Sequence, residues 1–327
     1  MVKSEDEFRH PCPPEEQGGL WGDTLWVSVV DRDANIFGIN HFHLTNQGYG
    51  RFEALYVIDG VQQLYGNKVP LAPEPDRGPW TDGRLTYEVV RPLEEIRITF
   101  DGPRYGFDLR FTGRFPVFDY ADSIDGNPLA HFHAYGGHFE QGMRCTGEFE
   151  IRGGPAKGQV RRLDSFAHRD HSWSTRFAEE PPWEPQHGHV PGHFWPSIQL
   201  RDMHINVFGV IDPKSYGLER SPIGGFCSDA RGSRPIRHAT AEILTEDDHR
   251  SAAAFRYAIT MPDGELWHVR TGRKYGMVKL WDRGENDLEN RMDCYEPFFD
   301  FLVEETGEVG YGVAEYSIQP PAPRWLV

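Results

Sequence analysis

Residues whose side chains can transfer protons or bind metals are concentrated near the middle of this 327-residue chain. The segment from Ser165 to Arg176 carries two histidines, an aspartate, two arginines and a tryptophan. Nine of the fifteen histidines lie between Ala130 and Ile205. Because buried His and Asp side chains need partners, folds rarely group them unless they form a polar network or perform proton chemistry. The function is therefore expected to depend on this part of the chain.

An extended conformation over residues 167–173 would divide these side chains between two faces. One face carries His168, Asp170 and Ser172, and the other carries Arg169, His171 and Trp173. Since a barrel has one interior, only one set is expected to point inward. The first set suits proton transfer, and the second suits binding and orienting a ligand. A structural network of ion pairs that joins two domains would collect the same residue types, so this alternative stays open.

A second group of histidines precedes this segment. His131 and His133 share a predicted strand face, and His138 shares one with Glu140. Ligands at these spacings can converge on one metal ion. The alternative to a cofactor-free site is therefore a metal site built from these four residues.

A long proline-rich stretch follows the central segment, from residue 178 to 192. It contains His187 and His189, and His193 comes directly after it. A connection of this length is a candidate lid over a site, although the same histidines could lie in an exposed loop.

The rest of the sequence predicts the secondary structure and the domains that position these residues. Short runs of alternating apolar and polar residues, such as 51–58 and 254–260, are separated by Asp-Gly pairs that favour tight turns. Two successive sets of such runs predict an all-β protein with two antiparallel β-barrel or sandwich-like domains and few short helices. The expected organisation is an N-terminal arm over 1–20, a first β domain over 21–165 and a second over 166–327. No residue-level repeat relates the two halves.

Composition excludes several classes of partner. The net charge of −16 and the pI near 5.4 disfavour nucleic acid and anionic membrane surfaces. No stretch approaches the roughly eighteen apolar residues of a spanning helix, and the start lacks the apolar core of a signal peptide. We expect a cytoplasmic protein that binds a hydrophobic small molecule, and the sequence leaves a homodimer open. The four cysteines show no CxxC spacing and are expected to be reduced.

Several sequence motifs are absent. The chain contains no Gly-x-Gly-x-x-Gly fingerprint, phosphate-binding loop, Gly-x-Ser-x-Gly elbow or His-Glu-x-x-His motif. Nucleotide-dependent and serine-hydrolase chemistry are therefore disfavoured.

Three segments carry a resemblance to a known family. Residues Gly137–Gly142, Arg169–Trp173 with Arg176, and His204–Phe208 resemble the lipocalin-like superfamily that contains carotenoid 1,2-hydratase (hydroxyneurosporene synthase) and AttH-type proteins. Ser174 departs from the pattern, since relatives tend to have Gly shortly before the family's Arg. The resemblance implies two consecutive calycin-like barrels with a ligand cavity at or near their junction. It also implies hydration of an isoprenoid alkene, or cyclisation of a polyene, without a redox cofactor.

Hydrating an alkene needs an acid that protonates carbon, a base that delivers water, and aromatic walls that stabilise the cation. We assign Asp170 as the proton donor, with its pKa raised by burial, and His168 or His171 as the residue that orients it or activates water. Glu140 is the second carboxylate. The residues expected to bind the substrate are Trp173, Arg176, His138, Trp195, Tyr135 and Asn206.

The same residues would serve a dehydratase, a double-bond isomerase or a cyclase. Two alternatives belong to other classes. One is a lipocalin-like protein that binds an apolar ligand without transforming it. The other is a metal-dependent enzyme that uses His131, His133, His138 or Glu140.

Overall fold

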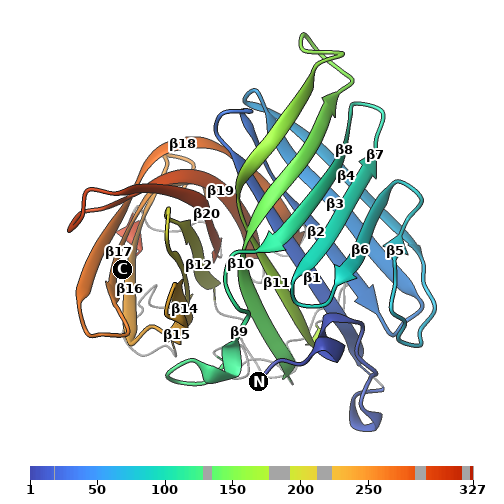
Figure 1. Ribbon diagram of the computed structural model, residues 1–327, viewed down its shortest axis with the longest axis horizontal. Coiled ribbons are helices and arrows are strands. Elements are labelled where there is room, and N and C mark those ends of the chain that lie inside the picture. The colour runs from blue at the N-terminus through green and yellow to red at the C-terminus, as the bar shows by residue number, and fades with distance from the viewer. Residues whose placement is uncertain are drawn as a thin grey trace. The chain divides into compact units, whose positions relative to one another are not determined.

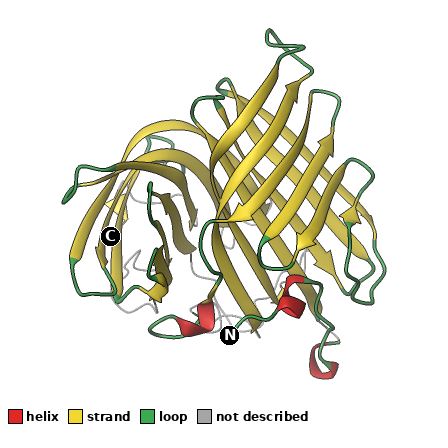
Figure 2. Cartoon of the chain, in the orientation of Figure 1, coloured by secondary structure: helices red, strands yellow, loops and turns green. Residues whose placement is uncertain are grey.

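The chain folds into two large antiparallel sheets, each curled into a half-barrel (Figures 1 and 2). The computed structural model describes residues 1–17, 19–127, 135–176, 192–211, 223–283, 292–318 and 325–326. Helical structure in these residues is limited to three short 3₁₀ turns, which are η1 (Ser4–Glu7), η2 (Pro14–Glu16) and η3 (Tyr120–Asp122). The predicted all-β fold class is therefore confirmed.

The first sheet contains eleven strands. They are β1 (Leu20–Asp31), β2 (Ile36–Thr45), β3 (Tyr49–Ile58), β4 (Val61–Pro70), β5 (Trp80–Thr81), β6 (Leu85–Arg91), β7 (Glu95–Asp101), β8 (Tyr105–Gly113), β9 (Phe118–Asp119), β10 (Tyr135–Ile151) and β11 (Val160–Arg176). Ten of them run in the order β4-β3-β2-β1-β11-β10-β8-β7-β6-β5, and β9 pairs with β10. The centre of this sheet is therefore the triplet β1, β11 and β10.

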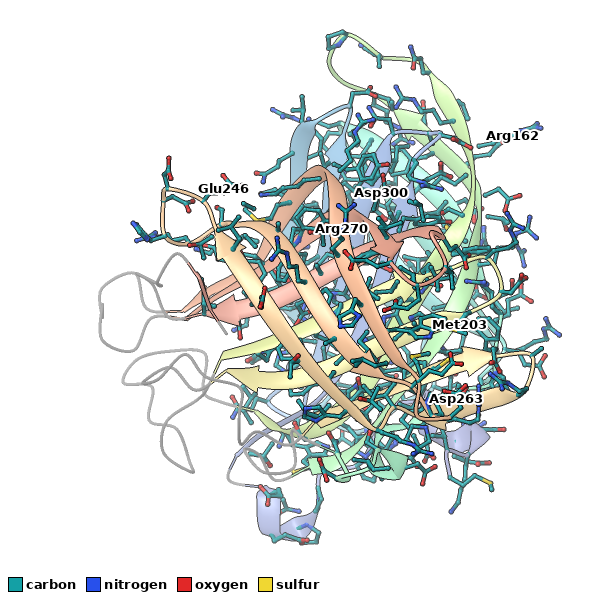
Figure 3. The ribbon with its side chains drawn as sticks, turned by 90° about the vertical axis from the view of Figure 1, so that its left-hand side faces the viewer. Arg162, Met203, Glu246, Asp263, Arg270 and Asp300 are labelled. Atoms are coloured by element: carbon teal, nitrogen blue, oxygen red, sulfur yellow. The ribbon has the colours of Figure 1, made fainter. Side chains whose placement is uncertain are left out.

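The second sheet contains ten strands. They are β12 (Gly192–Gln199), β13 (His204–Ile211), β14 (Ile223–Asp229), β15 (Gly232–Pro235), β16 (His238–Thr245), β17 (Ala252–Thr260), β18 (Leu266–Arg283), β19 (Met292–Val303), β20 (Val309–Ile318) and β21 (Trp325–Leu326). Their order is β15-β14-β13-β12-β20-β19-β18-β17-β16-β21. Outward-facing polar side chains such as Arg270, paired with Glu304 at 3.2 Å, line the exposed side of β18 (Figure 3).

The two sheets belong to two compact units. The first unit comprises Met1–Asp119 and His133–Trp183, and the second comprises Tyr120–Phe132 and Glu184–Val327. The division expected at residues 165–166 differs from this one, because β11 crosses that position as a single strand paired with β1 and β10. The segment from Ser165 to Arg176, which was expected to begin the second domain, is part of the first sheet.

The N-terminal arm packs onto the first unit. The side chain of Arg9 is buried and donates to the backbone oxygens of Ala72, Glu74 and Thr45 at 2.9–3.2 Å. Glu7 is also buried, although the sequence predicted an arm without core contacts. Glu7 and Arg9 are buried because each of them binds a partner that is far away in the sequence.

The Asp-Gly turn signals act as predicted. Asp59 and Gly60 connect β3 to β4 with φ values of 51° and 78°. Two successive left-handed residues match the twist of a two-residue hairpin, and Gly adopts this conformation without steric cost.

Alternation along the strands gives each unit an apolar core face. In β1, the side chains of Leu25, Val27 and Val29 belong to the core of the first unit, while Trp26 and Ser28 point to the opposite face. The second unit has a separate core that includes Phe194 and Tyr316. We call the side of β1, β11 and β10 that lies opposite the core the second face of the first sheet.

The strand orders show that the two sheets are built alike. Each of the ten positions in the first order has a counterpart in the second, so β1, β11 and β10 correspond to β12, β20 and β19. Trp26 lies opposite Asp170 in the first sheet, and Trp195 lies opposite Glu315 at the corresponding place in the second. The sequence showed no such repeat because only a few positions share residue types.

A second carboxylate accompanies each of these pairs. Glu140 on β10 lies opposite Asp170, and the register of β19 with β20 places Glu296 opposite Glu315. Glu140 and Glu296 are both fully buried. Each sheet therefore has a tryptophan and two facing carboxylates at equivalent places.

The described residues include no helix with the length and apolar character that crossing a bilayer requires.

Close packing at Gly38 gives the first prediction. Gly38 lies opposite the buried Tyr56, and a Cβ atom there would lie 2.4 Å from the Tyr56 ring. We expect Gly38→Ala to lower the free energy of unfolding by about 1–3 kcal/mol, measured by urea denaturation. Gly66→Ala is the matched control, since its Cβ would meet Glu53 at an ordinary 3.8 Å. Equal stability of the two variants would contradict this account of the packing.

Candidate functional site

Strand β11 presents polar side chains on both of its faces. His168 and Asp170 lie on the second face, and Arg169 and His171 lie on the core face, which is the division that alternation predicted. Only one set was expected to be buried, but all four side chains are buried. The core face includes polar groups because the N-terminal arm supplies their partners, as described below.

Four side chains on the second face form a chain of close contacts, which we call the acid–base chain. His168 Nε2 lies 2.6 Å from Glu140 Oε2, and Glu140 Oε1 lies 3.0 Å from His138 Nε2. The same nitrogen of His138 lies 3.5 Å from Asp170 Oδ1. Glu140 is thus held between two imidazoles, and His138 lies between two carboxylates.

The register of β10 with β11 explains how these side chains meet. Glu140 lies directly opposite Asp170, so both point to the same face. The residue opposite His168 is Gly142, which has no side chain to fill the space. The imidazole of His168 therefore contacts its diagonal neighbour, Glu140, which is within reach of a long side chain across an antiparallel pair.

The contact between His168 and Glu140 is the shortest in the acid–base chain. At 2.6 Å, the nitrogen and the oxygen are close enough for a proton to pass between them. Burial lowers the pKa of His168 to about 3. The imidazole of His168 is therefore neutral at pH 7.

Aromatic rings and a hydroxyl group lie next to the acid–base chain. The ring of Trp26 meets that of His168 edge to face, with centroids 5.7 Å apart, and Phe118 on β9 lies opposite Glu140. Ser28 Oγ accepts a hydrogen bond of 3.0 Å from the backbone N–H of His168. These neighbours keep the chain in an environment of low polarity, where proton affinities differ most from those in water.

The members of the chain differ in accessibility. The Asp170 side chain is 11% exposed, whereas those of His138, Glu140 and His168 are exposed by 2% or less. Asp170 is therefore the least buried member of the acid–base chain.

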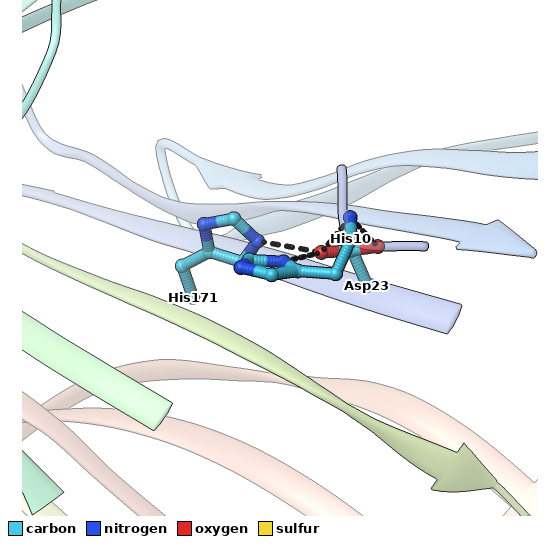
Figure 4. A group of neighbouring side chains, drawn as sticks. All are labelled: His10, Asp23 and His171. Carbon is cyan, nitrogen blue, oxygen red and sulfur yellow. Dashed lines mark hydrogen bonds and ion pairs between the residues drawn. The ribbon is translucent and has the colours of Figure 1, made fainter. Parts of the chain in front are cut away.

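A second cluster lies on the core face of the same strand, and we call it the arm cluster. Asp23 Oδ1 lies 2.6 Å from His10 Nδ1 and 3.1 Å from His171 Nε2 (Figure 4). The backbone N–H of His10 also donates to Asp23. The His10 ring stacks on Trp173, with centroids 3.6 Å apart and planes 8° from parallel.

Two glycines make room for Trp173. A Cβ atom on Gly137 would lie 2.2 Å from the Trp173 ring, and one on Gly136 would lie 2.3 Å from it. The Gly-Gly pair at the start of β10 thus permits the tryptophan to pack there.

Ionisation in the arm cluster follows from burial and hydrogen bonding. Burial acts to raise the pKa of Asp23, but hydrogen bonds from His10 and His171 outweigh it and lower that pKa. Burial lowers the pKa of His171 against the opposing effect of Asp23. Asp23 is therefore an anion at neutral pH, and His171 is neutral.

Arg169 completes the core face. Its guanidinium is buried, pairs with Glu7 of the arm and donates to Gln141 Oε1 at 3.0 Å. Burial acts to lower the pKa of Arg169, yet Glu7 and Tyr87 raise it overall. Glu7, His10 and Asp23 were not among the predicted site residues, since they lie far from the central segment and nothing in their spacing marks them.

Two predicted binding residues, Trp195 and Asn206, lie in the second unit. Tyr120 links them, since its hydroxyl accepts from Trp195 Nε1 at 3.3 Å and bonds to the Asn206 side chain. His193 Nε2, nearby on β12, lies 2.6 Å from Glu315 Oε1, and its Nδ1 lies 2.7 Å from Ser317 Oγ. Tyr120 was not predicted, because it follows a short strand without any distinctive pattern.

The remaining predicted residues have no described side chains. Tyr135 and Arg176 are strand residues at the ends of β10 and β11. His131 and His133 of the alternative metal site lie outside the described residues. So does the candidate lid over residues 178–192, except for Gly192, where β12 begins. Within the described part of the chain, two groups have the ligand types and spacing for a metal: His10–Asp23–His171 and His193–Cys294–Glu315.

Comparison with solved structures defines the class of fold. The chain superposes on kievitone hydratase from Nectria haematococca with a TM-score of 0.57 and 14% identity, covering 97% of this chain and 92% of that one. It superposes on CghA with Sch210972 with a TM-score of 0.58 and 11% identity, covering 92% and 88%. The protein therefore has the two-sheet fold of these structures.

The family follows from the sequence itself. Residues 3–320 match the family described as "Domain of unknown function (DUF7064)", and the chain belongs to this family. The search of curated proteins found no match. The more specific resemblance to carotenoid 1,2-hydratase and AttH-type proteins stays a prediction.

Burial of His168 gives a prediction about acid stability. An unfolded histidine takes up a proton near pH 6.5, whereas folded His168 does so only near pH 3. Between these two pH values the unfolded state therefore binds more protons than the folded state. As the pH decreases through this range, the free energy of unfolding decreases by up to about 1.4 kcal/mol per pH unit.

We expect the stability advantage of wild type over His168→Gln to shrink as pH falls from 7 to 4, measured by urea denaturation. His238→Gln, at an exposed position, is the control for loss of a surface imidazole. A constant difference between wild type and His168→Gln across this range would contradict the prediction.

Proposed function

We propose that this protein is an acid–base enzyme, a hydro-lyase or an isomerase or cyclase, that acts on a hydrophobic small molecule without a redox cofactor. The observation that carries the proposal is the buried chain of two imidazoles and two carboxylates that ends at Asp170, its least buried member. Polar groups of this kind are costly to bury, and perturbed groups of this kind mark sites of proton transfer. The fold shared with a protein named kievitone hydratase supports the same class of reaction.

Asp170 is the proposed proton donor. Its carboxylic acid gives a proton to one alkene carbon, the π electrons form the new C–H bond, and the neighbouring carbon becomes a cation. A water molecule attacks that carbon and releases a proton, so the net reaction adds water across the double bond. The reverse sequence removes water, and loss of a different proton from the cation gives an isomer.

The other members of the chain restore the donor. Glu140 accepts the proton released by water through the imidazoles that flank it. His138 lies within 3.5 Å of both carboxylates and returns a proton to Asp170. One chain of neighbouring groups thus serves as acid and base, with no net change in its protonation over a cycle.

The expected substrate is apolar and alkene-bearing, of the isoprenoid, terpenoid, steroid or polyketide type. The sequence resemblance to isoprenoid hydratases supports this substrate class. Trp26 borders the chain, and a tryptophan face stabilises a neighbouring cation.

The reaction is tested by hydrogen exchange at carbon. Purified protein is incubated with isoprenoid alkenes and tertiary alcohols in deuterated water, and products are analysed by mass spectrometry. Deuterium appears at carbon when the enzyme hydrates or isomerises an alkene, since both reactions transfer a proton from the exchangeable pool to carbon. Dehydration of a tertiary alcohol is detected instead as the alkene product. We expect Asp170→Asn to lower this rate by about 10²–10⁴-fold, the usual contribution of a general acid.

The matched control is Asp164→Asn. Asp164 lies on the same strand, but its side chain is 59% exposed and pairs with Arg144 at the surface. This variant should retain wild-type turnover. Undiminished turnover by a folded Asp170→Asn protein would contradict the assignment. Retention of an unaltered apolar ligand, without exchange on any substrate, would indicate a binding protein instead.

A further inference from the structure

Three potential metal ligands from separate segments converge in the arm cluster. His10 comes from the N-terminal arm, Asp23 from β1 and His171 from β11 (Figure 4). The nitrogen and oxygen atoms that they offer all lie within 4.8 Å of one another. Both imidazole nitrogens approach the same oxygen, Asp23 Oδ1.

The spacing of these atoms is close to that of a coordination site. Ligands about 2.0–2.2 Å from a metal, at tetrahedral or octahedral angles, lie about 2.9–3.5 Å from one another. The distance from His171 Nε2 to Asp23 Oδ1 is 3.1 Å and falls in this range. The distance from His10 Nδ1 to the same oxygen is 2.6 Å, so a movement of a few tenths of an ångström would admit an ion.

The groups in the cluster also favour a cation. Asp23 supplies a carboxylate beside two imidazoles, and these are ligand types that bind divalent metals. The outer nitrogen of His10, Nε2, lies 3.8 Å from Asp6 Oδ1. Asp6 therefore places a second carboxyl group near the cluster, although it makes no hydrogen bond to His10.

The groups next to His10, Asp23 and His171 have other partners or hold these residues in position. Glu7, the nearby acid of the arm, is committed to Arg169. Trp173 stacks on His10 and fixes the plane of its ring. The ligands are therefore positioned by contacts that do not depend on an ion.

We propose that His10, Asp23 and His171 bind a divalent transition-metal ion, such as Zn²⁺, Fe²⁺ or Co²⁺, that fastens the N-terminal arm to the core face of the first sheet. Two imidazoles and one carboxylate suit these ions and leave further coordination positions for water. The site is distinct from the acid–base chain, because the two lie on opposite faces of β11. It also differs from the metal site that the sequence suggested, which used His131, His133, His138 and Glu140.

The test is a metal titration of the full chain after treatment with a chelator. Co²⁺ binding is followed by visible absorption and Zn²⁺ binding by calorimetry. We expect His10→Gln to bind one equivalent less than wild type. A difference of one equivalent identifies this site even if His193, Cys294 and Glu315 bind an ion of their own.

His41→Gln is the matched control. His41 Nδ1 lies 2.8 Å from Glu53 Oε2 in the same sheet, so this variant also removes an imidazole paired with a carboxylate. The pair belongs to neither of the three-residue groups found in the described part of the chain. We expect His41→Gln to bind as many equivalents as wild type.

A second readout follows the arm itself. Trypsin cleaves after Arg9, whose side chain is buried when the arm is docked. Zn²⁺ at about 100 times its Kd should slow this cleavage by up to about 100-fold in wild type and in His41→Gln, but not in His10→Gln.

The proposal fails if wild type binds no Co²⁺ or Zn²⁺, or if folded His10→Gln binds as many equivalents as wild type. It also fails if Zn²⁺ leaves the cleavage rate of the wild-type arm unchanged. His10 lies outside the sheets, so loss of the fold does not obscure the result; a thermal melt of each variant checks this. Neither outcome alters the test of Asp170, which concerns the other face of β11.

Discussion

Burial of both faces of β11 is the constraint on which this structure depends. A strand of an antiparallel sheet usually packs one face on the core and turns the other toward water, but here His168, Arg169 and His171 are all buried. Each must then have a partner, because an uncompensated buried polar or charged group is costly. The partners come from β10 on the second face and from β1 and the N-terminal arm on the core face. The two polar networks are thus consequences of one strand's position.

The sequence predicted which side chains share a face of β11, but it did not predict which distant residues they contact. Alternation along residues 167–173 correctly separated His168 and Asp170 from His171, because the period of a strand is two. The pairing with Glu140 was also anticipated. The expectation of a single buried face was wrong, because no local pattern indicates that a distant arm supplies Glu7 and His10.

The features that could not be predicted depend on the pairing of strands that are far apart in the sequence. The predicted domain boundary divided β11, since the turn signals around it could not show that the strand continues the first sheet. The correspondence between Trp26 with Asp170 and Trp195 with Glu315 is likewise invisible in the sequence. It depends on strand order and on a few positions that keep the tryptophan and the carboxylates. Tyr120, which joins Trp195 to Asn206, was missed because it follows a short strand without a distinctive pattern.

The central claim is that the acid–base chain stores a proton on a carboxyl group that can reach a substrate. Infrared spectroscopy of the resting protein tests it directly, because a protonated carboxyl group absorbs apart from a carboxylate and no substrate is needed. The account predicts a protonated-carboxyl band at neutral pH that disappears or shifts in Asp170→Asn and is unchanged in Asp164→Asn. A spectrum at neutral pH in which Asp170→Asn and wild type show the same bands in this region would contradict it.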